Sequence, residues 1–157
     1  MELEIAKKTD IEELKQICNE FSKQEEDDLN IKDKIKNPYN TKKGIEFIQT
    51  YITKRNRTVF IIRNKKKNIV AFLFAKINPP KFNSKKPIKA DLTMMYVKAH
   101  YRSKGLGKQL TDEFKVWANK KGADKLNVTL WTHNKKADKF YRREGFKTST
   151  TTLEMNS

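Results

Sequence analysis

Apolar residues in the first third of the chain recur mostly at helical spacing. Residues 3–5 alternate like a short strand, and the apolar positions that follow predict a helix. These positions are Ile11, Leu14, Ile17 and Phe21. Residues 25–39 are acidic, then basic, and end in an Asn-Pro pair, which predicts an irregular connection with room for a helical turn. A second helix is expected to bury Ile45, Ile48 and Ile52.

The pattern changes at Thr58, where runs of β-forming residues replace the helical spacing. Residues 59–62 and 69–74 flank the polar turn 64–68, which is a hairpin signal. After a lysine-rich loop bracketed by prolines, residues 92–97 predict a further strand, and a glycine-containing loop follows it directly. This part of the chain is therefore expected to supply most of a sheet.

The last third alternates between helix and strand patterns. Helical spacing predicts a helix with the apolar positions Leu106, Leu110, Phe114 and Trp117. Residues 125–131 then alternate like a strand, and Asn134 is well placed to cap a helix that Gly145 ends. The threonine-rich residues 148–155 carry Leu153 and Met155 on one parity, which predicts a final strand.

These elements give the order β-α-α-β-β-β-α-β-α-β, a mixed α/β fold. A chain of 157 residues has the usual size of one domain. It contains no internal repeat, long linker or change in composition, so we expect a single domain over residues 1–157.

The formal net charge of +16 describes a surface that attracts anions such as nucleic acid or a phosphorylated cofactor. Lysine supplies most of the basic charge, and an adenine- and thymine-rich coding bias would have the same effect. A nucleic-acid-binding module using the lysines of residues 65–67 and 81–89 is thus an alternative function. No aromatic platform accompanies those lysines, and no helix-turn-helix or zinc signature occurs, so we expect no specific nucleic-acid partner.

Cysteine and histidine are scarce. The lone Cys18 cannot form an internal disulfide, and its apolar neighbours predict a buried core position rather than a nucleophile. No N-terminal apolar run resembles a signal peptide or a membrane span, which favours a cytoplasmic protein without membrane contact. His100 and His133 are interpreted as polar loop residues, and no ligand spacing predicts a metal site.

A strand passes through a short basic turn into a helix over residues 96–108. The free N–H groups and the dipole of a helix start bind anions, and Gly105 and Gly107 allow the main chain to approach phosphate oxygens. Arg102, Lys104 and Lys108 add positive charge. The glycine spacing matches neither a Walker loop nor a Rossmann fingerprint.

Here the sequence resembles the GNAT superfamily, the Gcn5-related N-acetyltransferases, over about residues 59–146. Its signature has Arg or Gln, two residues, Gly, one residue, then Gly or Ala, matched by Arg102, Gly105 and Gly107. Asn134 and the Phe-Tyr-x-x-x-Gly-Phe ending over residues 140–146 match downstream. The resemblance implies a mostly antiparallel central sheet flanked by helices, with acetyl-CoA as co-substrate.

The resemblance also implies where acetyl-CoA binds. The pantetheine arm would lie in a splay between the strand ending at Val97 and the strand over residues 125–131. The implied cofactor-binding residues are Tyr96, Val97, Arg102, Ser103, Lys104, Gly105, Leu106, Gly107, Lys108, Asn134 and Tyr141. Tyr96 and Val97 would act through their main chains, and Asn134 either contacts the cofactor or only caps its helix. Tyr141 would give a proton to the departing thiolate, and the alternative is a core aromatic residue.

The implied reaction is direct attack of a neutral primary amine on the thioester, without an acyl-enzyme. An N–H group near Val97 would stabilise the oxyanion. Asp91, Glu46 and acidic residues near Glu26 are candidate bases. A GNAT fold that senses acyl-CoA without catalysis is a further alternative. The acceptor, a small molecule or a peptide, and the oligomeric state, for which a homodimer is one option, stay open.

Overall fold

The chain folds around one sheet, and the computed structural model describes residues 1–30, 35–80, 82 and 85–157. The described residues form five strands in the spatial order β1-β2-β3-β4-β5. The strands are β1 Glu2–Ile5, β2 Arg57–Arg63, β3 Ile69–Asn78, β4 Lys89–Val97 and β5 Lys125–Val128. Neighbours from β1 to β4 are antiparallel, whereas β5 is parallel to β4. The mixed, mostly antiparallel α/β fold class is therefore confirmed.

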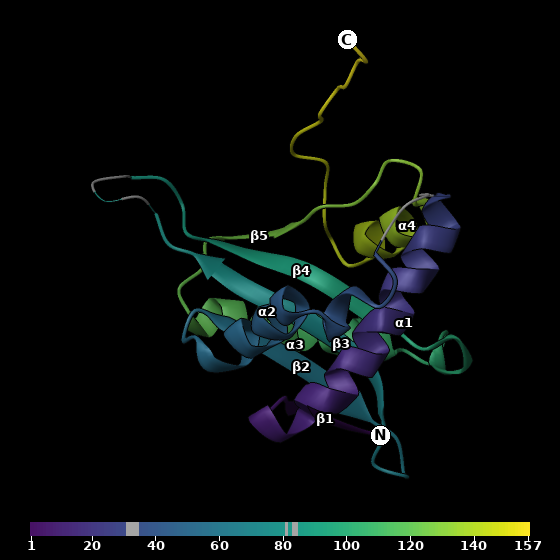
Figure 1. The fold of residues 1–157 in the computed structure, drawn as a ribbon. Coiled ribbons are helices and arrows are strands. Elements are labelled where there is room, and N and C mark those ends of the chain that lie inside the picture. Colours follow the sequence, from purple (N-terminus) through teal and green to yellow (C-terminus); the bar gives the residue numbers. More distant parts are fainter. Residues whose placement is uncertain (31–34, 81, 83–84) are drawn as a thin grey trace.

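Helices cover both faces of the sheet (Figure 1). They are α1 Ile11–Leu29, α2 Lys42–Thr53, α3 Leu106–Lys120 and α4 Lys135–Arg143, with 3-10 turns η1 Lys8–Asp10, η2 Pro38–Asn40 and η3 Ala99–Tyr101. One apolar cluster joins the sheet to α1 and α2, and a second joins it to α3 and α4. Because β2 and β3 are buried on both faces, their sequences are almost continuously apolar. None of the described helices is long and apolar enough to cross a membrane.

Helix α1 continues further than the sequence pattern predicts. It ends at Leu29, so the irregular connection predicted from residue 25 is wrong for the acidic residues 25–28, which are helical. Carboxylates near the C-terminus of a helix interact unfavourably with the negative end of its dipole, but the packing of α1 outweighs this local cost. Phe21 holds the helix against Phe72 and Tyr96, with ring centroids 6.0 and 5.8 Å apart. The helical turn η2 lies inside the predicted stretch, and residues 31–34 fall outside the described residues.

The final strand predicted over residues 148–155 is wrong. Residues 147–157 carry no helix or strand and extend away from the body (Figure 1). Leu153 and Met155 are 90% and 94% exposed. Threonine favours β-structure, but a strand gains stability only when it pairs with a neighbour and buries a face. The observed element order therefore ends at α4.

Strands β4 and β5 separate partway along their length. Their last paired residues are Leu92 and Val128, and β4 continues to Val97 without β5 beside it. The strand predicted over residues 125–131 ends early for this reason. The pairing of β4 with β3 also shifts between Leu92 and Met94, which leaves Thr93 in a β-bulge. The separation implied by the family resemblance is thus present, and it opens next to this bulge.

Candidate functional site

The loop between β4 and α3 delivers free main-chain donors to one place. Its backbone is left-handed at Ser103 and at Gly105, with φ angles of 58° and 78°. Gly105 is the N-cap of α3 and adopts this conformation without a Cβ clash. No side chain caps this helix start, and no acidic residue lies in its first turn. The leading N–H groups and the positive end of the helix dipole therefore form a site for an anion.

Gly107 lies where α3 approaches α4 closely. A Cβ at this position would be 3.2 Å from Cε2 of Phe140 and 3.9 Å from Cε of Met95. The first distance is shorter than ordinary van der Waals contact, so a larger residue would push against the Phe140 ring. Gly107 is thus needed for packing as well as for access to its N–H group.

Arg102 is exposed to solvent, but its guanidinium also contacts β4 and α1. Its Nε donates to the carbonyl oxygen of Val97 at 2.9 Å, and its Nη2 donates to Gln24 of α1. The guanidinium also lies 5.7 Å from the centroid of the Tyr96 ring. Arg102 therefore ties the loop to β4 and α1, which the signature alone did not indicate.

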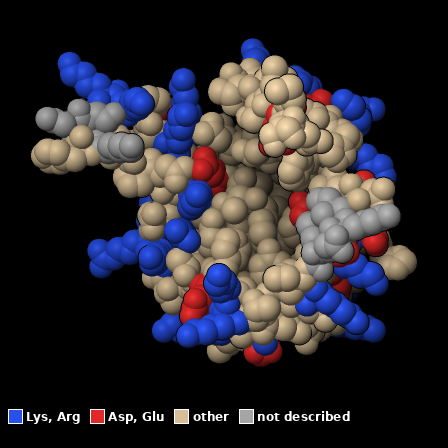
Figure 2. Space-filling view, turned by 45° about the horizontal axis from the view of Figure 1, so that its top comes forward, with Lys and Arg blue, Asp and Glu red and all other residues tan. Residues whose placement is uncertain are grey.

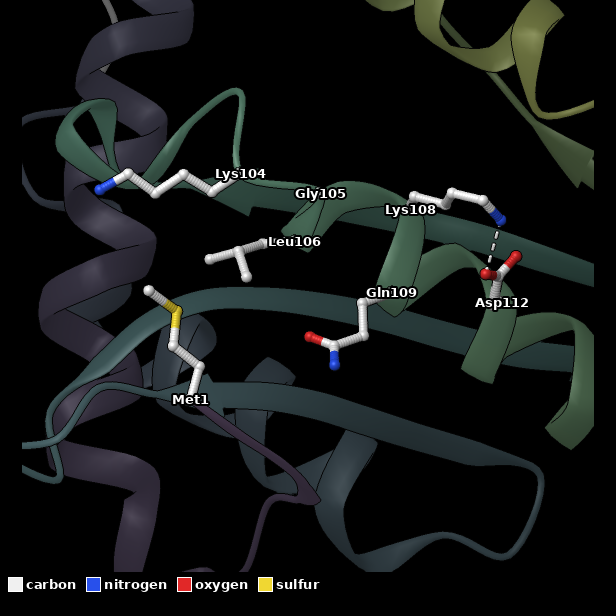
Figure 3. A pocket seen from close by; sticks show the side chains of 7 residues that line it. All are labelled: Met1, Lys104, Gly105, Leu106, Lys108, Gln109 and Asp112. Atoms are coloured by element: carbon white, nitrogen blue, oxygen red, sulfur yellow. Dashed lines mark hydrogen bonds and ion pairs between the residues drawn. The ribbon is translucent and has the colours of Figure 1, made fainter.

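The two lysines of the loop lie apart from each other (Figure 3). Lys104 Nζ lies 5.4 Å from the centroid of the Tyr101 ring, and its side chain points away from Lys108. Lys108 Nζ pairs with Asp112 at 2.7 Å. Lys104 lines a second pocket together with Met1 and Leu106. The side chains of Met1 and Leu106 point toward each other in Figure 3. Lys108 lines both this second pocket and the larger cavity described below, whereas Lys104 lines the second pocket and not the larger cavity.

The edge of β4 offers main-chain groups to the gap beside β5. The N–H of Lys98 donates to the carbonyl oxygen of Val70, 3.0 Å away, which makes these two opposite residues a hydrogen-bonded pair. Because such pairs alternate in an antiparallel ladder, the main chain of Tyr96 also faces β3, whereas those of Met95 and Val97 face the gap. Tyr96 therefore contributes its ring to this region rather than main-chain hydrogen bonds.

A cavity of about 1070 Å³ joins these features. Its walls come from the end of α1, the end of β4, the loop, the start of α3, and α4. The sequence-predicted residues that line it are Tyr96, Val97, Arg102, Ser103, Gly105, Leu106, Gly107, Lys108 and Asn134. Lys104 and Tyr141 do not belong to its lining. The structure thus brings most of the predicted site together.

Asn134 caps α4 and also faces the cavity. Its Oδ1 accepts a hydrogen bond from the N–H of Ala137 at 3.1 Å, which confirms the capping role. Its Nδ2 has no hydrogen-bond partner among the described residues, so this donor is available to a ligand in the cavity.

Tyr141 lies beneath the cavity in the core between the sheet, α3 and α4. The residue is 8% exposed and packs edge-on against Phe140 and Phe146. Burial raises the pKa of the phenol above its ordinary value, so the hydroxyl stays protonated at neutral pH. Within the described part of the chain, no side chain or main-chain group hydrogen-bonds this hydroxyl. Tyr141 thus packs in the core, and its hydroxyl is free of hydrogen bonds to the described residues.

The end of α1 forms an acidic wall that the sequence analysis placed in a connection. The acidic residues of this wall are Glu20, Glu25, Asp27 and Asp28. Figure 2 shows the hollowed face of the molecule, with acidic side chains at the rim and basic side chains around the outside. The contiguous acidic run was the available sequence signal, but its place in the cavity depends on the extension of α1.

The candidate bases Asp91 and Glu46 lie outside the cavity lining. Asp91 accepts hydrogen bonds from Asn78 and from Asn127, the latter at 3.3 Å. Glu46 lies on α2, 4.0 Å from Lys42. His100 and His133 are exposed, as expected for loop residues. The described residues contain no cluster of three or more potential metal-ligating side chains.

Known structures share this fold at low sequence identity. A mutant of the BH1408 protein of Bacillus halodurans is 15% identical, with a TM-score of 0.86 over 100% of this chain and 99% of that one. AAC(6')-Iy bound to a bisubstrate analogue of CoA and acetylneamine is 15% identical, with a TM-score of 0.77 over 99% and 97%. The aminoglycoside 6'-N-acetyltransferase AAC(6')-Ih of Acinetobacter baumannii is 13% identical, with a TM-score of 0.75 over 99% and 97%. No curated protein sequence matches the chain.

The family is identified by sequence rather than by these likenesses of fold. The profile of the acetyltransferase (GNAT) family matches residues 13–146, which includes the loop, α3 and α4. With its signature glycines at the start of α3, the chain belongs to the GNAT acetyltransferase family.

Proposed function

We propose that this protein is an N-acetyltransferase that moves the acetyl group of acetyl-CoA to a primary amine. The observation that carries the proposal is one cavity that connects the uncapped start of α3 with the open edge of β4. An anion site and a row of main-chain donors in one cavity suit a phosphorylated cofactor with an amide-containing arm.

The residues fit acetyl-CoA by their chemistry. The N–H groups at the start of α3 and the cations of the loop would hold the phosphates. Val97 and Met95 would hydrogen-bond the arm through the main-chain groups that face the gap. Asn134 would donate its free Nδ2, and Gly107 leaves the helix start unobstructed. Tyr96 would contact the arm through its ring.

Direct transfer in a ternary complex suits this site. Acetyl-CoA supplies an activated acetyl group as a thioester. The amine nitrogen bonds to the carbonyl carbon, and a main-chain N–H group of β4 that faces the gap stabilises the oxyanion. The carbon–sulfur bond breaks, and Tyr141 gives its proton to the thiolate. Burial raises the pKa of this phenol, which keeps it protonated at neutral pH but makes it a weaker acid, so the transfer requires the phenol to approach the sulfur atom closely. The proton of the attacking amine passes to water or to a carboxylate of the acceptor side.

A cationic acceptor suits the acidic end of α1. Asp27 and Asp28 lie on the cavity wall, so they would attract an amine that carries positive charge, whereas Glu20 on the same wall is paired with Lys98 at 3.1 Å. The aminoglycoside acetyltransferases of similar fold support a small-molecule amine, and a peptide amine is the other acceptor class of the proposal. The buried Cys18 is consistent with a reducing cytoplasm.

The experiment that tests this function measures cofactor binding and turnover separately. Acetyl-CoA should raise the melting temperature, because a ligand that binds only the folded state stabilises it. Thiol release across a panel of amines then identifies the acceptor. No melting shift at saturating acetyl-CoA would refute the proposal. A shift without acetylation of any amine would favour the acyl-CoA sensor, whereas sequence-selective, salt-resistant nucleic-acid binding would favour the nucleic-acid module.

A further inference from the structure

The bulge in β4 turns two consecutive side chains toward the same face of the sheet. Leu92 belongs to the core under α3, whereas Met94 packs in the core under α1 and α2. Thr93 also points toward α2, because its hydroxyl lies 2.8 Å from that of Tyr51. Met94 is contacted from the same side by the hydroxyl of Tyr39, 3.2 Å from its sulfur atom. Two tyrosines thus fix the two bulge residues.

Thr93 does not itself line the cofactor cavity, but it lies on β4 two residues before Met95, which does. It follows Leu92, the last residue of β4 that pairs with β5, so it lies at the narrow end of the gap. Met95 and Val97, on the opposite face of β4, line the cofactor cavity. The extended strand from Thr93 to Val97 spans about 13 Å. A cofactor arm that enters beside α3 along this strand would therefore bring its reactive end toward Thr93.

Thr93 is the polar, exposed side chain among the apolar residues 92–97. Tyr51 is 2% exposed, and Thr93 is its hydrogen-bond partner among the described residues. Burial raises the pKa of the Tyr51 phenol, which therefore stays protonated at neutral pH. Either hydroxyl of this pair can be the donor. When the Tyr51 phenol donates, Thr93 Oγ1 keeps one lone pair that can accept a further hydrogen bond.

We propose that Thr93, oriented by Tyr51, binds the amino group of the acceptor by accepting an N–H hydrogen bond. This assignment rests on the proposed acetyltransferase function and adds the residue that positions the amine. Asp91 lies two residues earlier on β4, where its carboxylate accepts hydrogen bonds from Asn78 and Asn127 and lies 3.9 Å from Lys76 Nζ, so its charge is balanced within the protein. Thr93 is the acceptor-binding residue, and Tyr51 is its positioning residue.

The test compares Thr93→Val, which removes the hydroxyl but keeps the shape, with Thr93→Ser, which keeps the hydroxyl. With an amine that the wild-type protein acetylates, Thr93→Val should lower kcat/KM for the amine by roughly 3- to 10-fold, the range of one neutral hydrogen bond. Thr93→Ser should stay within about twofold of wild type. The Kd for acetyl-CoA should be unchanged in both variants, since Thr93 does not line the cofactor cavity.

Tyr51→Phe should lower the same kcat/KM, and Tyr51→Phe combined with Thr93→Val should be no worse than Thr93→Val alone. Thr53→Val is the matched control, because Thr53 is an exposed residue of α2 whose hydroxyl donates to the carbonyl of Gln49 at 2.8 Å. Unchanged amine kcat/KM in Thr93→Val, with acetyl-CoA turnover intact, would overturn the Thr93 assignment and leave the function standing. Wild-type protein that neither binds acetyl-CoA nor acetylates an amine would overturn both.

Discussion

Tyr141 combines near-complete burial with a hydroxyl that no described residue hydrogen-bonds. Replacement by Phe keeps the ring between Phe140 and Phe146 and removes only the proton donor. We therefore predict that Tyr141→Phe lowers kcat by about 100-fold or more, the usual contribution of a general acid. The Kd for acetyl-CoA and the melting temperature should change little. Steady-state kinetics and thermal melting measure the two effects separately.

The alternative role of Tyr141 as a core aromatic residue makes the opposite prediction. Tyr141→Phe would then have wild-type kcat even when the chemical step is shown to limit the rate. Tyr141→Leu is the stability control, because loss of the ring should lower the melting temperature in either case. A kcat loss in Tyr141→Phe without a matching loss of stability would support the general acid.

At the scale of elements, local patterns predicted those parts of the fold whose stability is local. The hairpin of β2 and β3 and the apolar face of α3 follow directly from their periods. The end of α1 did not, because Phe21 and the contact of Gln24 with Arg102 connect it to residues far along the chain. The tail over residues 148–155 has a strand-like sequence, yet it lacks a paired neighbour.

The candidate site likewise has features that nearby residues encode and features that depend on residues far along the chain. The motif located the loop and the start of α3, since glycines and backbone direction are encoded within a few residues. The contact of Arg102 with Gln24 and the bulge at Thr93 involve α1 and α2, and no local spacing signals them. The contact of Gly107 with Phe140 likewise joins two helices and was not predictable from the loop alone.

The start of α3 provides the next prediction. Gly107→Val should abolish the melting shift caused by acetyl-CoA and should also destabilise the protein by about 1–3 kcal/mol, because the added atoms press on Phe140. Gly122→Ala at the other end of α3 is the control. Gly122 has a φ angle of 75° and open space around it, so this change costs stability through the backbone alone.

The acetyl-CoA shift should persist in Gly122→Ala. Thermal melting of both variants with and without acetyl-CoA measures this shift. A full shift in Gly107→Val would mean that the start of α3 is not the phosphate site. Combining Gly107→Val with Phe140→Leu should recover part of the lost stability without recovering the shift, since the helix start stays obstructed.

At the scale of the whole molecule, two apolar clusters on opposite faces of one sheet each bury a titratable side chain. Cys18 lies in the cluster under α1 and α2, and Tyr39 packs against that cluster. Tyr141 lies in the cluster under α3 and α4. Burial raises the pKa of all three groups above the ordinary values of 9.0 for the thiol and 10.0 for the phenols. Both apolar clusters therefore favour the protonated, neutral forms of these thiol and phenol groups.

These raised pKa values predict a loss of stability at alkaline pH. Below about pH 9 the three groups are protonated in both states, so their burial carries no ionisation penalty. Above the ordinary values the unfolded chain ionises while the folded chain stays protonated, so the free energy of unfolding falls as pH rises. Melting temperatures measured from about pH 9 upward should therefore decline as the pH rises. The absorbance of ionised Tyr39 and Tyr141 should appear only when the protein unfolds. Tyr39→Phe should reduce the slope of the decline. Full titration of every tyrosine in a protein that is still folded would show that solvent reaches these hydroxyls and that the core is less closed than its packing indicates.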